Sequence, residues 1–343
     1  MERRRFLQQS AMAGITVLLG TRVLANGTNW FDPKSHSTTG TSQHSLPSFA
    51  QPTGYQPVSA SYTLQGRPIK IHAFSTGEGS VKRNFLAKKG PGPLSKLNIL
   101  LGGQYADYMP IWVWVIEHPE GLIVIDTGEI PEAMDSDQHL AGESALNRYI
   151  SRHTMRFRIA DTEVLDRQFE RLGLQLDRVQ LVILTHLHLD HTDGLRFFPK
   201  TEVVVGEVEW KHPYSPSSST WPKGFRPRTL TYLPDQLPIF GAAMPLTQAG
   251  DLLYLPTPGH TRGHSSVLLR ADEGDIFFAG DVTYTQQQLL LRQLPGVHQD
   301  YGLARNTYQK ILDYAQQRPF LYLPSHDPEA GLRLVQKQFL VEH

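Results

Sequence analysis

Four side chains of the types that bind divalent metals stand within six consecutive residues. The run His186-Leu187-His188-Leu189-Asp190-His191 carries three imidazoles and one carboxylate. Packed this tightly, these groups would repel one another when protonated and would lose solvation when buried, unless a cation compensated for both. The run therefore predicts a metal centre with His186, His188, Asp190 and His191 among its ligands.

Three later turns have a composition that suits further ligands. Each follows an apolar run, is rich in Gly or Pro and carries His or Asp; the turns span residues 257–264, 279–281 and 324–327. Tight turns at strand ends can direct side chains from distant parts of the chain into one cavity. We therefore expect the remaining ligands to come from these turns.

The composition limits what this centre can be. The chain has no cysteine, which excludes disulfides, Cys-ligated zinc, iron–sulfur clusters and thiol nucleophiles, so any metal must be held by His and carboxylates. Thirty-three basic residues balance thirty-three acidic ones, so no overall field attracts nucleic acid or an anionic membrane. With 343 residues, 40% of them hydrophobic, the chain has the composition of a globular protein with a sizeable core.

Short β-branched or aromatic runs, bounded by turn residues, predict strands from residue 68 onward. They cover residues 69–74, 111–116, 122–125, 179–184, 203–205, 252–255, 266–269, 276–278 and 320–323. The run 179–184 is continuously apolar, as expected for a strand buried on both faces, and it leads directly into the metal-binding run. The metal-binding run should therefore stand at a strand end.

Helices are predicted between some of these strands. Asp161 is expected to cap a helix whose apolar residues Leu165, Phe169 and Leu172 recur at helical spacing before Gly173 ends it. A second helix is expected over residues 303–317. Strands outnumber helices, yet helices recur between them, which favours an α/β fold of two sheet layers covered outside by helices, a four-layer αβ/βα sandwich.

The N-terminal 66 residues differ from the rest of the chain. In residues 1–25, Arg3-Arg4-Arg5 precede a short apolar stretch and a small-residue cleavage site, which resembles a twin-arginine signal peptide. The apolar stretch is shorter than the roughly 20 residues that span a bilayer, so no permanent membrane anchor is expected. We expect export by the twin-arginine machinery to the periplasm; a disordered basic tail is the alternative. Residues 26–66, rich in Ser, Thr, Gly and Pro, predict a flexible linker before one folded domain, 67–343.

Taken in order, these motifs resemble those of the metallo-β-lactamase superfamily, from about residue 69 to the C-terminus. The resemblance implies a hydrolase with two divalent metals and seven ligands: His186, His188 and His260 for one metal, Asp190, His191 and His326 for the other, and Asp281 between them. Such metals share a water whose pKa falls from 15.7 to about 7, which supplies a bridging hydroxide. Zinc is the default for His and carboxylate ligands, and iron, manganese or cobalt are alternatives.

Two further residues belong to matching motifs but are expected outside the ligand set. Hydrogen bonds from His264 and Asp126 could fix the orientation of metal-bound imidazoles. A purely structural role for Asp126, closing the turn Asp126-Thr127-Gly128, is equally compatible with the sequence.

Residues 109–117, running on into 121–128, resemble the N-terminal hairpin of the quorum-quenching N-acyl-homoserine lactone lactonases. Tyr284 lies three residues after Asp281, where that family keeps a catalytic tyrosine. The resemblance implies opening of a lactone ring by the bridging hydroxide, with Tyr284 donating a hydrogen bond as charge develops and Asp190 moving the proton. A packed aromatic side chain is the alternative interpretation of Tyr284.

Other functions remain open at this stage. The main alternative is a broader metallo-esterase or phosphotriesterase-like hydrolase on the same centre, and a thioester hydrolase or a di-iron redox module has less support. A serine hydrolase is disfavoured because residues 263–267 lack the closing glycine of a nucleophile elbow. Residues 82–108 and 210–245 are extra relative to a minimal lactonase, and they are expected to form a lid, an acyl-chain groove, a homodimer contact or a surface excursion.

Overall fold

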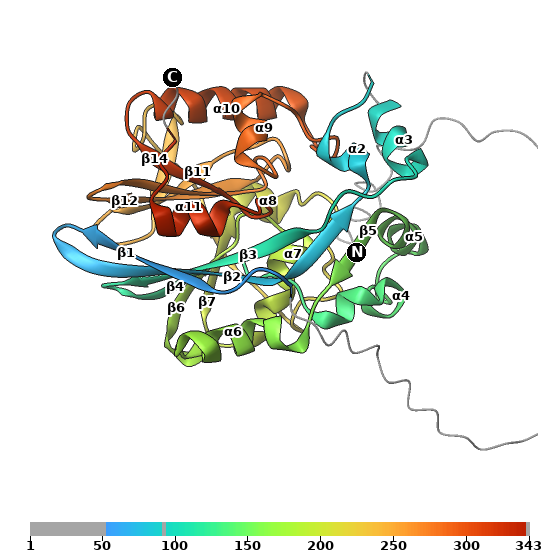
Figure 1. The fold of residues 1–343 in the computed structure, drawn as a ribbon, viewed down its shortest axis with the longest axis horizontal. Coiled ribbons are helices and arrows are strands. Elements are labelled where there is room, and N and C mark those ends of the chain that lie inside the picture. Colours follow the sequence, from blue (N-terminus) through green and yellow to red (C-terminus); the bar gives the residue numbers. More distant parts are fainter. Residues whose placement is uncertain (1–52, 91–93, 341–343) are drawn as a thin grey trace, which may run out of the picture. The chain divides into compact units, whose positions relative to one another are not determined.

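Two β-sheets face each other and carry helices on their outer sides (Figure 1). The computed structural model describes residues 53–90 and 94–340. The predicted signal peptide, and residues 26–52 of the predicted linker, lie outside these ranges. No helix in the described ranges is long and apolar enough to cross a membrane.

The first sheet has eight strands, in the order β1-β2-β3-β4-β6-β7-β8 with β5 paired to β2. The strands are β1 (Val58–Leu64), β2 (Arg67–Val81), β3 (Met109–His118), β4 (Gly121–Ile125), β5 (Met155–Arg158), β6 (Val179–Ile183), β7 (Glu202–Gly206) and β8 (Arg228–Leu230). Strands β1 to β4 pair antiparallel, and β4, β6, β7 and β8 pair parallel.

The second sheet has six strands, in the order β14-β13-β12-β11-β10-β9. The strands are β9 (Leu233–Pro234), β10 (Ala242–Pro245), β11 (Leu252–Pro256), β12 (Ser265–Ala271), β13 (Gly274–Gly280) and β14 (Phe320–Pro324). Its neighbours pair antiparallel except β13 and β14, which are parallel.

The helices connect and cover these strands. The α-helices are α2 (Arg83–Leu86), α3 (Leu94–Leu101), α4 (Ser136–His139), α5 (Ala145–Thr154), α6 (Leu165–Leu172), α7 (Leu189–Thr192), α8 (Glu207–Lys211), α9 (Gln286–Leu290), α10 (Tyr301–Ala315) and α11 (Ala330–Gln336). Short 3₁₀ helices are η1 (Pro131–Met134), η2 (Asp161–Glu163), η3 (Leu176–Arg178) and η4 (Asp193–Phe197).

Three apolar layers hold the sheets and helices together. The central layer joins the inner faces of both sheets and includes Trp114 and Phe278. Because successive strand residues point to opposite faces, Phe277 instead packs behind the second sheet, in the cluster that contains α10. A third cluster packs Phe169 of α6 behind the first sheet against Phe74. The αβ/βα sandwich predicted from the sequence is confirmed.

Two sequence predictions differ from the structure in detail. The predicted linker overlaps β1, in which Ala60, Tyr62 and Leu64 are buried, so the end of that segment belongs to the folded domain. This period of two is hidden within a Ser- and Thr-rich composition. Asp161 was expected to cap helix α6, but it lies in η2 and the helix begins at Leu165; Gly173 does end it, with φ +68°.

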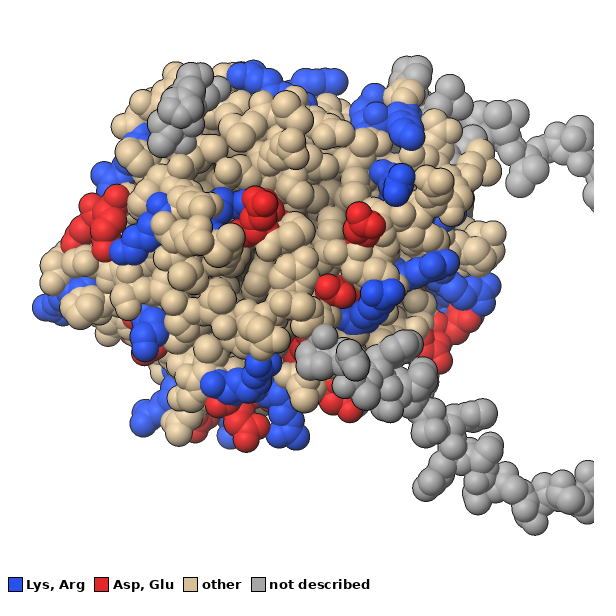
Figure 2. Space-filling view, in the orientation of Figure 1, with Lys and Arg blue, Asp and Glu red and all other residues tan. Residues whose placement is uncertain are grey.

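The two extra segments take part in the architecture. Residues 82–108 form α2 and α3, and the backbone there bonds to the stretch after α9, where Gly296 N donates to Phe85 O at 2.7 Å. Residues 210–245 add β8 to the first sheet and β9 and β10 to the second. Basic and acidic side chains are interspersed on the face shown in Figure 2, in keeping with the zero formal net charge.

Candidate metal centre

All seven predicted ligands lie at strand ends or in the turns that follow them. The chain leaves β6 just before His186 and His188 and then forms α7 with Asp190 and His191; His260 lies between β11 and β12, Asp281 follows β13, and His326 follows β14. Buried strands from both sheets thus deliver polar side chains to one place. The structure brings together two groups with ligand-type geometry.

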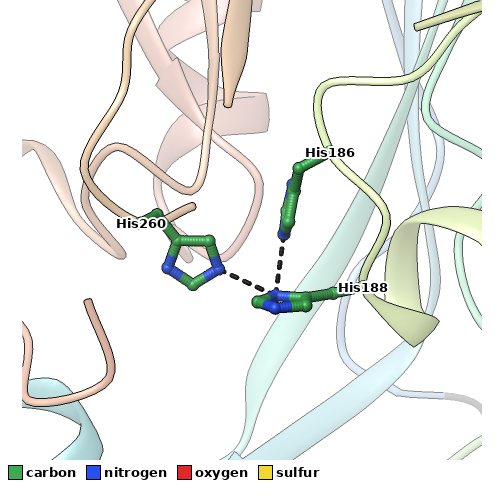
Figure 3. Close-up of side chains that lie close together, drawn as sticks. All are labelled: His186, His188 and His260. Atoms are coloured by element: carbon green, nitrogen blue, oxygen red, sulfur yellow. Dashed lines mark hydrogen bonds between the residues drawn. The ribbon is translucent and has the colours of Figure 1, made fainter. Parts of the chain in front are cut away.

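The first group contains imidazoles alone. His186 Nε2 lies 3.0 Å from His188 Nδ1, and His260 Nε2 lies 2.9 Å from the same atom (Figure 3). His186 and His260 are buried. Three ring nitrogens therefore converge on a point from two different sheets.

The second group mixes imidazoles with carboxylates. His326 Nε2 lies 3.2 Å from Asp190 Oδ2, and His191 Nε2 lies 3.8 Å from Asp190 Oδ1. Asp281 reaches both groups, because its Oδ1 is 3.3 Å from the Nε2 atoms of His191 and His326 while its Oδ2 is 3.4 Å from His260 Nε2. This is the arrangement that a bridging carboxylate requires.

Outer hydrogen bonds fix which ring nitrogen carries the proton. His188 Nε2 faces Tyr214 O at 3.0 Å, His191 Nδ1 faces Asp126 Oδ2 at 2.8 Å, and His326 Nδ1 faces Pro110 O at 2.9 Å. Each partner only accepts, so each outer nitrogen must donate. When one of these three rings is neutral, its inner nitrogen carries a lone pair, which is the form that binds a metal.

In His186, too, the outer ring nitrogen carries the proton. Two lone pairs, one on His186 and one on His188, therefore face each other. Thr185 Oγ1 donates to Asp126 at 2.9 Å, so it accepts from His186 Nδ1 at 3.0 Å. The unprotonated Nε2 of His186 then meets the unprotonated Nδ1 of His188. In addition, His191 Nε2 and Asp281 Oδ1 are buried without a hydrogen-bond partner in the described part of the chain. The facing lone pairs of His186 and His188, and the unpartnered atoms of His191 and Asp281, fit divalent cations held between them.

Charge divides the two groups. Burial lowers the pKa of His186 and His260 well below the usual range, so both are neutral. Burial opposes protonation of His326 as well, but the carboxylates of Asp281 and Asp190 overcome it and raise its pKa to about 10. For His191, burial is likewise outweighed, chiefly by Asp126, and the pKa lies well above its ordinary value.

Asp126 and His264 hold parts of the centre, as predicted for residues outside the ligand set. Asp126 has a left-handed backbone, φ +57°, and its Oδ1 accepts from Thr185 N at 2.8 Å, while its Oδ2 accepts from His191. His264 Nε2 accepts from Asp281 N at 3.0 Å. Burial lowers the pKa of His264 to about 3, which keeps that nitrogen an acceptor.

Glu209 was not identified from the sequence. It is fully buried on α8, its Oε1 accepts from Leu187 N at 3.1 Å, and its Oε2 accepts from Thr261 Oγ1 at 2.6 Å. It thereby joins the loop of His186 and His188 to the turn of His260. A carboxylate three residues after an apolar strand is the only sequence signal that could have indicated it.

Tyr284 lies beside both groups. Its ring is centred 5.5 Å from that of His326 and 6.5 Å from that of His260. Burial, aided by Asp281 and Asp190, raises the pKa of Tyr284 well above its ordinary value, so it stays a phenol and a hydrogen-bond donor. Asp190 is the more open carboxylate, with its side chain 24% exposed against 4% for Asp281.

A family model described as the metallo-beta-lactamase superfamily matches residues 106–326, which include the candidate centre. The chain belongs to this superfamily. The resemblance found in the sequence is thereby confirmed, and it places the chain in a superfamily whose members use divalent metals. The sequence-derived ligand set stays a prediction that this geometry supports.

Several proteins are similar to this member of the superfamily. A probable metallo-hydrolase of Mycobacterium tuberculosis is 29% identical over 211 residues, 58% of this chain, and the match spans only 64% of that protein's length. The N-acyl homoserine lactonase AttM of Agrobacterium fabrum is 28% identical over 249 residues, 66% of this chain and 86% of its own.

Solved structures show the same metallo-beta-lactamase fold. An N-acyl homoserine lactone hydrolase with the product N-hexanoyl-L-homoserine at its catalytic metal centre has a TM-score of 0.61 at 17% identity, covering 79% of this chain and 98% of that one. AidC, a dizinc quorum-quenching lactonase, has a TM-score of 0.54 at 14% identity, covering 81% and 92%.

Proposed function

We propose that this chain is a metal-dependent lactonase that opens N-acyl-homoserine lactones. The observation that carries the proposal is the position of Tyr284, a buried phenol next to ligand rings of both groups. The relatives named N-acyl homoserine lactonases, matched over 86% of the length of AttM, support the substrate class.

Seven side chains would hold the metals: His186, His188 and His260 in one group, Asp190, His191 and His326 in the other, and Asp281 between them. A bound pair of divalent cations supplies Lewis acidity and an activated water at neutral pH. Nitrogen and oxygen donors without thiolate make zinc the default, with iron, manganese and cobalt also suited to such ligands.

The chain's own residues supply orientation and proton transfer. The Tyr284 phenol would donate a hydrogen bond to the lactone as negative charge develops on its carbonyl oxygen, because its raised pKa keeps the hydroxyl protonated. Asp190 would accept the proton that the attacking water loses and would give it to the ring oxygen that leaves. It suits this role because it is the more exposed of the two carboxylates in the centre.

A substrate panel tests the proposal directly. The purified chain is loaded with Zn²⁺, its metals are counted, and ring opening of short- and long-chain N-acyl-homoserine lactones is followed beside γ-lactones and a neutral phosphotriester. We expect acyl-homoserine lactones to be turned over with the highest kcat/KM. If phosphotriesters were hydrolysed and every lactone were left intact, the lactonase assignment would be wrong.

Tyr284→Phe separates catalysis from packing. The variant keeps the ring but loses the donor, so kcat should fall by roughly 10²- to 10³-fold, as when one oxyanion donor is removed. The metal count should not change. Tyr62→Phe is the matched control, because Tyr62 is also buried and its hydroxyl bonds to Leu334 O on α11 instead. Equal rates in the two variants would leave Tyr284 as a packing residue.

We also propose that the chain reaches the periplasm by twin-arginine export. The support is the Arg3-Arg4-Arg5 sequence ahead of a short apolar stretch. Replacing Arg4 and Arg5 with Lys should trap the precursor in the cytoplasm, as cell fractionation would show. Unchanged export of that variant would exclude the route.

A further inference from the structure

A second cluster of metal-binding side chains lies outside the candidate centre. Glu129, His139 and Asp193 each offer one ligand-type atom, and these atoms lie within 4.8 Å of one another. Glu129 follows the turn after β4, His139 ends α4, and Asp193 begins η4. None of the three is among the seven ligands proposed above.

The two carboxyl groups of this cluster are buried. Glu129 is 0% exposed and Asp193 is 2% exposed. One oxygen of each is already held: Glu129 Oε1 accepts from Ile130 N at 3.0 Å, and Asp193 Oδ1 accepts from Thr220 Oγ1 at 2.6 Å. These outer contacts fix both carboxyl groups and leave one oxygen of each for the interior of the cluster.

The inner oxygens are not satisfied by protein donors alone. His139 Nε2 lies 2.5 Å from Asp193 Oδ2, but Glu129 Oε2 is buried and has no hydrogen-bond partner among the described residues. An unpaired carboxylate oxygen in the interior is costly. Two neighbouring carboxylates can share a site only if a proton or a cation lies between them.

We propose that Glu129, His139 and Asp193 bind a third divalent cation. Two carboxylate oxygens and one imidazole suit Zn²⁺, Mn²⁺ or Fe²⁺, and the outer hydrogen bonds to Ile130 and Thr220 orient the ligands as supporting contacts do in other metal sites. Burial of Glu129, the charge of Asp193 and a hydrogen bond between the two carboxyl groups raise the pKa of Glu129 well above its ordinary value, so a proton takes the place between them when no cation is bound.

The contact between His139 and Asp193 would have to lengthen to admit an ion. Two ligands at about 2.0–2.2 Å from a tetrahedral ion stand roughly 3.3 Å apart. In the candidate dimetal centre, neighbouring ligand atoms are already separated by 2.9 to 3.4 Å. His139 would therefore withdraw from Asp193 by less than about 1 Å, and it lies on a helix of only four residues.

The third cation would hold in place the loop that carries Asp190 and His191. Asp193 follows His191 by two residues, and the intervening Thr192 accepts from Trp221 Nε1 at 3.2 Å. Thr220 and Trp221 belong to the extra segment 210–245, and His139 belongs to α4. One ion would thus join α4, the β4 turn and the metal-binding loop, with the extra segment packed against them.

Metal counting and anomalous diffraction test this site without relying on activity. The full chain is equilibrated with excess Zn²⁺ or Mn²⁺, exchanged into metal-free buffer, and analysed by mass spectrometry of the metals. We expect three ions per chain in the wild type and two in both Glu129→Gln and His139→Ala. Glu170→Gln, which changes an exposed Glu on α6, and His153→Ala, which changes a His on α5, should keep three.

Crystals of the wild type soaked in Mn²⁺ give an independent readout in case a variant fails to fold. An anomalous peak between Glu129, His139 and Asp193 would support the site. A count of two with peaks only in the dimetal centre would overturn it and would assign a shared proton to the carboxyl pair. Failure of the lactonase proposal is distinguishable, because it would change the substrates that are turned over and not the number of ions.

Discussion

The two ligand groups of the candidate centre differ in charge although they share Asp281. The first group, His186, His188 and His260, is made of neutral rings, and the lone pairs of His186 and His188 face each other. The second group pairs imidazolium rings with carboxylates when no metal is bound, because His326 and His191 have raised pKa values. Ion pairs can thus keep the second group assembled without metal, whereas the rings of the first group carry no charge to hold them together.

This difference shows how one scaffold prepares two unequal sites. The second group must release protons when it binds a cation, whereas the first group is already neutral and releases none. Asp281 connects the groups, since its own pKa, which burial would raise, is held well below the usual range by His326, His191 and His260. The permanent negative charge of Asp281 is therefore the feature on which both sites depend.

Asp281→Ala should have the largest effect of any single change. It removes the carboxylate that reaches ligand atoms of both groups, so both metals should be lost or weakened together and lactone turnover should fall by more than about 100-fold. Metal analysis and kinetics on the purified variant provide the measurement, with the exposed Asp137→Asn as control. Full metal occupancy with undiminished turnover would remove Asp281 from the centre.

Asp126→Asn should weaken the second group more than the first. Asn tolerates the left-handed backbone at this position, so the variant removes the charge facing His191 without straining the turn. Loss of such an outer partner typically costs 10- to 100-fold in metal affinity or activity. Chelator competition should show one binding step weakened by that factor, and an equal loss in both steps would contradict the unequal roles assigned to the groups.

The pH dependence of metal binding should separate the two groups. Between the ordinary His pKa of 6.5 and the folded value of about 10, His326 is protonated without metal, so a cation must displace that proton. Affinity for the second group should therefore rise about tenfold per pH unit for each proton released, from pH 7 to pH 9. The first group, neutral throughout this range, should stay flat. Competition titrations at pH 7, 8 and 9 would show this, and two steps of identical slope would refute the charge difference.

Much of the fold could be predicted because apolar runs reveal buried strands directly. The run 179–184 corresponds to β6, and the run 320–323 to β14. Strand β1 was missed because its buried residues alternate with Ser and Thr, and composition alone then resembles a linker. Strands β8 to β10 are only two to four residues long, and their pairing depends on the sheets that they join.

The ligands could be proposed from the sequence because each stands in a short motif, whereas their partners could not. Tyr214 holds His188 through its backbone carbonyl, which no side-chain pattern records. Glu209 lies 22 positions from Leu187 and 52 from Thr261, so its role appears only when three segments meet. Glu129 and His139 likewise gain a shared neighbour only through the fold.

Glu209→Gln should have the smallest effect on activity. It tests how the first group is held in place without charges of its own. Without ion pairs, that group relies on Glu209 to hold the backbone at Leu187 and the Thr261 hydroxyl, and Gln keeps the shape and one acceptor. The turn that follows His260 also packs closely against Glu209, because a Cβ added at Gly263 would lie 2.2 Å from Glu209 N. We expect turnover to change by less than about tenfold.

The stability of the same variant should respond clearly to pH. Burial raises the pKa of Glu209 from 4.5 to about 7, so the folded state prefers the protonated acid, and the wild type loses stability as pH rises from 4.5 through 7. The loss in the free energy of unfolding approaches about 3 kcal/mol, because each unit of pKa shift corresponds to about 1.36 kcal/mol. The variant avoids this loss because Gln cannot ionise. Urea unfolding in chelator at pH 5 and pH 8 should therefore show that the free energy of unfolding of the variant, relative to that of the wild type, is higher at pH 8 than at pH 5. The exposed Glu170→Gln is the control. Parallel pH profiles for the variant and the wild type would mean that Glu209 is ionised throughout and braces the first group as a carboxylate.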